Sequence, residues 1–302
     1  MDIGKKIKKL RTEKLMTQSE LTGGEITRNM LSRIENGAAL PSLGTVVYLA
    51  GKLGVPAGYL LSEGEEEFIY RKSSVMKNIR RAYTDKSFEL CRDICLSEFD
   101  EFDDELELIL TDCCLGVAEE CVKHGQLRRA CEFLDEAVNH SRNTMFDTTT
   151  QTNAVIIIFC LLKSISPALD SDEIDTDKQE DSYHPSVFGN IFCKYITVLQ
   201  NIQKYPLFES DIEDIEEESL SANDRLFVLH AKAKWLIEEE EYTKALSVLK
   251  EVIDSETVPE RLLLYLACAD MEICCRETGD YKGAYEYSIN KIEILEHMLA
   301  ED

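Results

Sequence analysis

Apolar residues near the N-terminus recur at the spacing of an amphipathic helix. Ile3, Ile7 and Leu10 lie three or four positions apart. Four basic residues lie off this stripe, namely Lys5, Lys6, Lys8 and Lys9. The pattern predicts a first helix that buries the apolar stripe and turns a cationic face to solvent.

Capping and turn residues divide positions 17–61 into four more short helices. Thr17 and Glu20 form a capping box that starts the second helix at Gln18, and Thr27 caps the third. Glycine follows the second, third and fourth segments, where helix ends favour it. The helices predicted in this way cover residues 18–22, 28–35, 43–53 and 55–61.

Several segments of this region occur in the order and spacing of a known DNA-binding family. They are Thr17-Gln18-Ser19-Glu20-Leu21, Ser32-Arg33-Ile34-Glu35-Asn36-Gly37, Pro41-Ser42-Leu43, Leu53-Gly54-Val55-Pro56 and Tyr59-Leu60-Leu61. Residues 3–62 therefore resemble the XRE (lambda-repressor-like) helix-turn-helix family, which implies a five-helix domain that binds a double-stranded DNA operator. The turn at residues 22–25 is about one residue shorter and richer in glycine than the family pattern, which predicts a reshaped turn before the recognition helix.

The third predicted helix carries the residue types that read base edges. A recognition helix places its N-terminal side chains in the major groove. Arginine there can bond guanine acceptors in bidentate fashion, and asparagine can do the same with adenine. We therefore expect base contacts from Arg28, Asn29 and Arg33, with Met30 or Ser32 at a thymine methyl or a phosphate.

Other polar residues of the same region are predicted to contact the DNA backbone. By the family resemblance, Gln18 and Asn36 would fix phosphates, and Thr27 at the cap completes the predicted DNA-binding set. Lys5 and Lys9 would add a salt-dependent attraction that carries no sequence information. The alternative for each residue is an ordinary solvated side chain.

Charge is unevenly divided between the head, residues 1–62, and the rest of the chain. The 302 residues contain 33 Lys+Arg and 58 Asp+Glu, for a formal net charge of -25. The head alone carries nine basic and five acidic side chains, a net of +4, which leaves -29 for residues 63–302. A basic head on an acidic body fits DNA binding, whereas the total charge alone would argue against a polyanionic partner.

Three segments of the acidic body share a second pattern. They are Gly125-Gln126-Leu127 with Ala130, Glu241-Tyr242 with Ala245, and Gly279-Asp280-Tyr281 with Ala284. Each follows a long apolar helical stretch, and the small alanine lets two paired helices approach closely. The segments resemble the second half of a tetratricopeptide repeat, and the 39-residue interval from Tyr242 to Tyr281 fits one repeat with a longer loop.

The predicted fold class is therefore all-α. We expect the head at 1–62, an acidic hinge at 63–67, and a tetratricopeptide-like domain at 68–302 that senses a ligand and dimerises. Five or six antiparallel helix pairs would wind into a right-handed superhelix with a concave face. The acid-rich segment 170–182 is predicted as a flexible loop, and 209–219 as a solvated helix or loop.

The combination of head and repeats resembles the cytoplasmic peptide-pheromone receptor regulators of Gram-positive bacteria, of the Rgg/PlcR/PrgX type. The resemblance implies a cytoplasmic homodimer whose repeat groove binds a short peptide that resets DNA binding. Asparagine can pair with both backbone N–H and C=O groups of a peptide. The candidates are Asn139, Asn153, Asn190 and Asn201, although each also fits an ordinary polar surface position. The rival hypothesis is a scaffold that docks a protein partner, binds no small peptide and uses the head only as a DNA anchor.

Motifs of other functional classes are missing from the sequence. The longest apolar run, 154–162, is about half of a membrane span, and residues 1–16 lack the apolar core of a secretory signal. The spacing of His and Cys predicts no metal site, and the eleven Cys are expected as reduced, buried side chains. No phosphate-binding loop, Gly-x-Ser-x-Gly or His-Glu-x-x-His motif occurs, so neither an enzyme nor a cofactor is expected.

Overall fold

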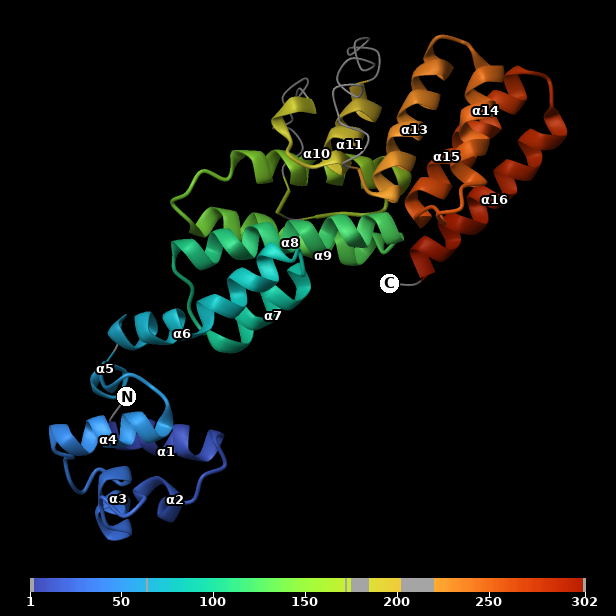
Figure 1. Cartoon of the computed structure of the whole chain (residues 1–302). Coiled ribbons are helices and arrows are strands. Elements are labelled where there is room, and N and C mark those ends of the chain that lie inside the picture. Colours follow the sequence, from blue (N-terminus) through green and yellow to red (C-terminus); the bar gives the residue numbers. More distant parts are fainter. Residues whose placement is uncertain (1–2, 64, 172, 175–184, 202–219, 301–302) are drawn as a thin grey trace. The chain divides into compact units, whose positions relative to one another are not determined.

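A computed structural model describes residues 3–63, 65–171, 173–174, 185–201 and 220–300 (Figure 1). Over these ranges the chain forms fifteen α-helices, one short 3-10 helix (η2, Pro185–Val187) and no strand. The prediction of an all-α protein is confirmed. Contacts divide the chain into two compact units, Met1–Arg81 and Ala82–Asp302.

The N-terminal unit contains the predicted head helices, and their caps form as expected. The Thr17 Oγ1 accepts a 3.2 Å bond from the Glu20 amide, and the Glu20 carboxylate accepts a 2.7 Å bond from the Thr17 amide. Thr27 and Ser42 cap the third and fourth helices in the same way. The helices are α1 (Ile3–Glu13), α2 (Gln18–Thr22), α3 (Arg28–Glu35), α4 (Leu43–Leu53), α5 (Ala57–Leu61) and α6 (Glu65–Thr84).

Lys6 departs from the prediction of a cationic outer face on α1. Its side chain is fully buried, and Nζ donates to the carbonyl oxygens of Tyr59, at 3.2 Å, and Ser62. Nζ also lies 3.0 Å from Oε2 of Glu67. The prediction was wrong because the end of α5 covers this side of α1, and a buried cation there satisfies carbonyls that the helix end leaves free.

The acidic segment at 63–67, expected as a hinge, is partly helical. α6 begins at Glu65, so residues 65–67 form its first turn. Acidic side chains are favoured at a helix N-terminus, and Lys6 neutralises one of them, Glu67. The contact-based division of the chain falls later, after Arg81.

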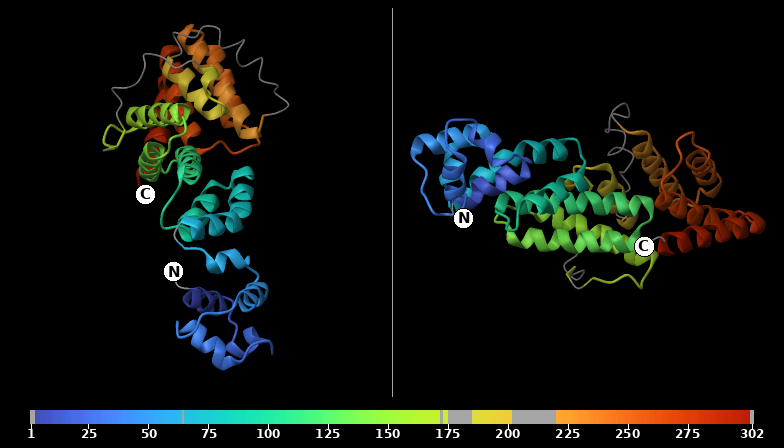
Figure 2. Two further views of the ribbon diagram at one scale, coloured as in Figure 1. Left: turned by 90° about the vertical axis from the view of Figure 1, so that its left-hand side faces the viewer. Right: turned by 90° about the horizontal axis from the view of Figure 1, so that it is seen from below.

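The C-terminal unit is built from neighbouring helix pairs, which the two views of Figure 2 show side by side. The predicted repeat segments open α9, α14 and α16, each packed against the helix before it. Ala130 and Ala245 are fully buried, as close pairing requires, whereas Ala284 is half-buried. The right-handed winding of the pairs stays a prediction. The helices are α7 (Phe88–Glu98), α8 (Asp104–His124), α9 (Leu127–Asn143), α10 (Thr149–Ile165), α11 (Ile191–Asn201), α13 (Ala222–Glu238), α14 (Tyr242–Ile253), α15 (Arg261–Glu277) and α16 (Tyr281–Ala300).

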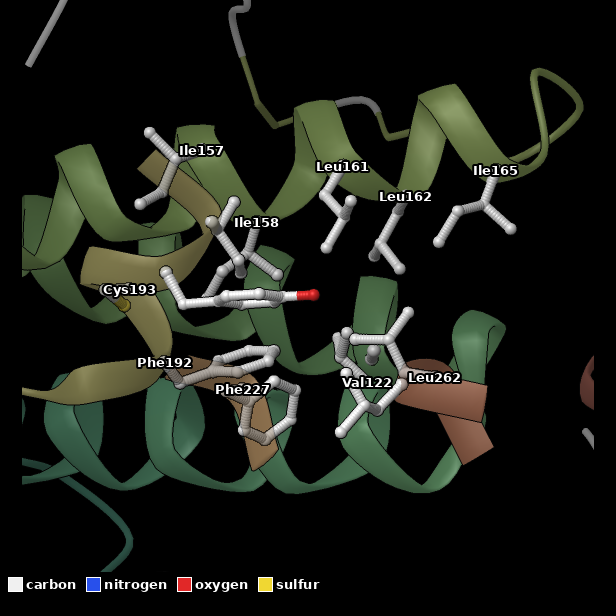
Figure 3. Packing of buried hydrophobic residues seen from close by; sticks show 14 of the residues in the cluster. Val122, Ile157, Ile158, Leu161, Leu162, Ile165, Phe192, Cys193, Phe227 and Leu262 are labelled. Carbon is white, nitrogen blue, oxygen red and sulfur yellow. The ribbon is translucent and has the colours of Figure 1, made fainter. Parts of the chain in front are cut away.

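The long apolar run of the sequence forms the centre of the C-terminal core. Ile158 and Leu162 of α10 are fully buried, close to Phe192 of α11, Phe227 of α13 and Val122 of α8 (Figure 3). A helix that is apolar on most sides is stable only where neighbours cover it. Thus α10 is an interior helix, and no helix in the described ranges is both long and apolar enough to cross a membrane.

Two further predictions concern the cysteines and the acidic segments of this unit. Ten of the eleven cysteines are buried and Cys160 is half-buried, which confirms their prediction as buried side chains. The segment 209–219 lies wholly outside the described residues, and most of 170–182 does as well.

Candidate nucleic-acid interface

The third helix presents a polar face to solvent and an apolar face to the core. Leu31 and Ile34 are buried against the head core, and this contact fixes the rotation of α3. Arg28, Asn29 and Arg33 are exposed on the other side. The structure therefore leaves the three predicted base-reading side chains free of the core.

The ends of α3 and its remaining candidates also lie where DNA could reach them. Thr27 is exposed, and its hydroxyl accepts a 3.2 Å bond from the Met30 amide at the N-cap. Met30 is 37% exposed, Ser32 is half-buried, and Asn36 is an exposed residue at the C-cap. Four more predicted DNA contacts therefore lie on α3 or at its caps, namely Thr27, Met30, Ser32 and Asn36.

An ion pair that the sequence analysis did not predict holds α3 to α1. Arg11 Nε lies 2.6 Å from Glu35 Oε1, and Nη2 lies 3.1 Å from Oε2. The remaining Arg11 nitrogen donates to the carbonyl of Met16 at 2.9 Å. Burial raises the pKa of Glu35, but the bonds from Arg11 and Gln18 outweigh burial and leave the pKa below its usual value.

Gln18 links this ion pair to the recognition helix. Its Nε2 donates to Glu35 Oε2 at 2.7 Å, and its Oε1 lies 3.5 Å from Nε of Arg28. Glu35 therefore orients Gln18, and Gln18 in turn lies beside Arg28. The phosphate contact of Gln18 stays a prediction. The two contacts of Gln18 also allow it to position the Arg28 side chain.

The glycine-rich turn between α2 and α3 is compact. Gly23 and Gly24 have φ of +51° and +92°, values that favour glycine. Tyr48 donates to the Thr22 carbonyl at 2.8 Å, and a Cβ on Gly23 would collide with its hydroxyl. The short turn therefore depends on glycine at position 23 and on the hydrogen bond that Tyr48 of α4 donates.

Lys5 and Lys9 of α1 stay exposed although α1 packs closely against α3. Gly4 is buried against α3, and a Cβ at this position would collide with the carbonyl oxygen of Ile34. Lys5 and Lys9 are exposed, and Lys9 Nζ lies 3.8 Å from Oε1 of Glu13. Both remain available for the predicted salt-dependent attraction to phosphates.

The four asparagines predicted to contact a peptide lie on or next to three helices of the C-terminal unit. Asn139 of α9 is exposed and Asn153 of α10 is half-buried. Asn190 already donates to Glu119 Oε1 at 2.8 Å and accepts from the Cys193 amide at 2.7 Å, so it caps α11. The side chain of Asn201, the last residue of α11, lies outside what the structure describes.

A polar cluster that the sequence did not reveal lies where α8, α13 and α15 meet. Asn223 Nδ2 donates to Glu260 Oε1 at 2.9 Å, while Asn223 Oδ1 and Glu260 Oε2 are buried without a hydrogen-bond partner among the described groups. Lys123 Nζ lies 2.7 Å from Glu120 Oε1. Burial raises the pKa of Glu260, and the charge of Lys123 opposes this rise.

A second buried network joins α11, α13 and α15. The Tyr195 hydroxyl lies 2.9 Å from Nδ1 of His230, and Nε2 of His230 lies 3.3 Å from Oδ2 of Asp270. Lys234 donates to Oδ1 of Asp270 at 2.7 Å. Burial raises the pKa of Asp270, but the contacts with His230 and Lys234 outweigh it and lower the pKa overall. The network is a structural link between repeats, since its members are buried or nearly so.

Comparison with known proteins assigns a family to the head. The helix-turn-helix family model HTH_3 matches residues 7–60. No curated protein matches the chain. Among solved structures, it is similar to PlcR of Bacillus thuringiensis in complex with the peptide PapR7 and DNA, at 18% identity and a TM-score of 0.25, over 99% of this chain and 97% of that one. It is also similar to the apo form of the competence regulator ComR of Streptococcus vestibularis, at 19% identity and a TM-score of 0.22, over 99% and 96%. Residues 7–60 therefore form a helix-turn-helix domain of the XRE type.

Proposed function

We propose that this chain is a transcriptional regulator that binds a two-fold DNA operator as a homodimer. The observation that carries the proposal is the exposed polar face of α3, with Arg28, Asn29 and Arg33 on an XRE-type domain. These side chains have the donors and acceptors that distinguish guanine and adenine in the major groove. The positive charge of the head adds a steering attraction to any duplex.

A stripe on the last helix supports the dimer. Tyr281, Tyr285, Ile289 and Ile292 of α16 are 73%, 67%, 37% and 50% exposed, and their spacing places them on one face. An exposed apolar stripe of this kind marks a surface that meets another protein. The stripe is therefore our proposal for the surface that meets a second copy.

Charges beside this stripe favour an antiparallel pair of α16 helices. Lys282 is exposed near the N-terminus of the helix, whereas Glu293 and Glu296 are exposed near its C-terminus. An antiparallel pair brings the lysine of each copy toward the glutamates of the other. A parallel pair would bring like charges together.

Mass measurement in solution tests the dimer, and a strict monomer at micromolar concentration would contradict it.

The second part of the proposal is a peptide ligand for the repeat unit. Asn223 Oδ1 and Glu260 Oε2, which have no partner in the part of the chain that the structure describes, are acceptors, so a group that donates hydrogen bonds would satisfy them. Backbone N–H groups and cationic side chains of a peptide are such donors. The net charge of -29 on residues 63–302 also favours a cationic or neutral peptide. A peptide and DNA are the ligands that the PlcR structure contains.

Calorimetry with a library of short peptides tests this part. Saturable binding of one peptide per subunit, weakened by Glu260→Gln and unchanged by Glu132→Gln at an exposed position of α9, is the expected result. The rival scaffold predicts no short-peptide binding and retention of a full-length protein partner instead. If Asn139→Ala alone weakens binding, the ligand lies on α9 and not at the Asn223–Glu260 pair.

A further inference from the structure

Three cysteines bring their thiols together where α7 packs against α8. Cys91 and Cys95 are one helical turn apart on α7, and Cys113 comes from α8. All three side chains are fully buried, and the Cys91 thiol is hydrogen-bonded to those of Cys113 and Cys95. We call these three residues the thiol trio. No group of His, Cys, Asp or Glu in the described ranges is arranged to hold a metal ion, so the trio is not a metal site.

The two neighbouring thiols favour the thiolate form of Cys91. Hydrogen bonds from Cys113 and Cys95 stabilise a negative charge on Cys91 Sγ and outweigh burial, so the pKa of Cys91 lies below its ordinary value. The bond to Cys91, together with burial, raises the pKa of Cys95 and of Cys113. The thiolate is the nucleophilic form of cysteine. The trio therefore places one nucleophilic sulfur beside two thiols that can react with its oxidised form.

Two other cysteines of the C-terminal unit lie in less reactive surroundings. Cys114 Sγ lies 3.6 Å from Oε2 of Glu136, and burial together with the charge of that carboxylate raises the pKa of Cys114 to about 12. Burial also raises the pKa of Cys160, the one half-buried cysteine of the chain. Thiolate character therefore favours reaction at Cys91, whereas exposure alone would favour reaction at Cys160.

A cavity gives a small molecule a route toward the trio. It has a volume of about 370 Å³ and is lined by α7, α8 and the start of α9, with Phe88, Gly116 and Val117 at the junction of α7 and α8. Phe88 precedes Cys91 by one turn, and Gly116 and Val117 follow Cys113 by one turn. The first turn of α7 also lacks a side-chain cap, which favours its local opening. A molecule little larger than water can therefore come within one helical turn of both sulfurs.

We propose that the thiol trio is a redox-modification site in which hydrogen peroxide converts Cys91 and Cys113 into a disulfide. Cys95 is the poorer partner, because side chains one turn apart on a helix have Cβ atoms about 5–6 Å apart, whereas a disulfide needs about 3.8 Å. In reducing compartments, disulfides of proteins are usually transient and redox-sensing. The bond would tie α7 to α8 reversibly, independently of DNA and peptide binding.

The reaction consumes one peroxide and yields two waters. The Cys91 sulfur attacks one peroxide oxygen, so an S–O bond forms, the O–O bond breaks, and the leaving hydroxide takes up the thiol proton as water. The Cys113 sulfur then attacks Cys91 Sγ, so the S–S bond forms, the S–O bond breaks, and the second hydroxide leaves with the Cys113 proton as water. Each sulfur is oxidised by one electron, and the two electrons reduce the peroxide.

The test treats the full chain with hydrogen peroxide and follows the bond by mass spectrometry. The intact chain should lose the mass of two hydrogen atoms. Trypsin cuts after Arg92, so Cys91 is released in residues 87–92, whereas Cys95 and Cys113 are released in residues 93–123. These two fragments should stay joined until a reductant is added, and fragmentation of the joined peptides should place the bond at Cys113. Hydrogen exchange of α7 should slow after oxidation, because α7 can no longer separate from α8.

Variants separate this pair from the other cysteines. Cys91→Ser and Cys113→Ser should each abolish the joined fragments, whereas Cys114→Ser, at the adjacent position, is the matched control and should keep them. Oxidation of Cys160 while Cys91 stays reduced would overturn the proposal, because exposure alone would then decide the reaction. A bond from Cys91 to Cys95, or no bond in the oxidised chain, would overturn it as well. Fragmentation of the wild-type peptides locates the bond by itself, so a variant that fails to fold does not leave the question open.

Discussion

Arg11 and Glu35 form a two-pronged ion pair that joins α1 to the end of the recognition helix, with 2.6 Å between Nε and Oε1. Both side chains are largely buried, at 12% and 2% exposure. Removal of one partner leaves the other as a buried, uncompensated charge, which costs about 3 kcal/mol or more. Glu35→Ala should therefore destabilise the head strongly, and faster hydrogen exchange of α3 amides would report it. Glu25→Ala, an exposed change in the same unit, is the control.

Acid should weaken the head through the same carboxyl. Because folding lowers the pKa of Glu35, the unfolded chain binds more protons than the native chain below the unfolded pKa. The stability that Glu35 provides is complete above about pH 4.3, the ordinary glutamate value, and is lost as pH falls through the lower folded pKa. The opening free energy of α3 amides, taken from exchange rates corrected for the intrinsic effect of pH, should fall more between pH 5 and 3 in the wild type than in Glu35→Gln. An equal fall in both would contradict this assignment.

Substitutions of Arg28 and of Lys9 should weaken DNA binding in different ways. Arg28→Ala should cost about 1–3 kcal/mol at one base pair and relax specificity there. Lys9→Ala should weaken binding to all sequences alike and lower the slope of log affinity against log salt by about one. Affinities measured at several salt concentrations separate the two cases. If Arg28→Ala weakens binding to all DNA sequences equally, Arg28 contacts a phosphate and not a base.

Lys6 should matter for the junction of α5 and α6 and not for DNA attraction. Lys6→Met keeps the aliphatic length but leaves the Tyr59 and Ser62 carbonyls and the Glu67 carboxylate without the buried ammonium. Loss of such a buried partner costs about 1–3 kcal/mol for the groups left unpaired. Hydrogen exchange should rise at residues 57–68. The exposed Lys5→Met change should leave exchange there unaltered and reduce the salt slope of DNA binding instead.

Features that depend on neighbouring residues were predictable from the sequence. The Thr17–Glu20 capping box and the Thr27 cap use side chains three residues apart, so the start of α2 and of α3 follows from local order. The starts of α9, α14 and α16 follow from short motifs in the same way. The burial of Lys6 was missed because it depends on where α5 ends. The spacing of apolar residues in α1 carries no information about that position.

Contacts between distant positions were not predictable. Arg11 and Glu35 are 24 positions apart, and the Tyr195–His230–Asp270 network joins three helices. Nothing in the local sequence around each of these residues identifies its partner. Glu35 lies inside Ser32–Gly37, one of the segments that resemble the XRE family, and its position at the end of a basic helix was the one local indication of an ion pair.

Selection of bound duplexes from a random pool, at a stated salt concentration, tests whether α3 reads DNA sequence. The wild-type chain should enrich a two-fold sequence with half-sites about one helical turn apart. The Arg28→Ala, Arg33→Ala double variant should lose the base preference while it keeps weak, salt-dependent binding. If the wild type enriches no sequence, or the double variant enriches the same sequence, α3 does not determine which DNA sequence is bound.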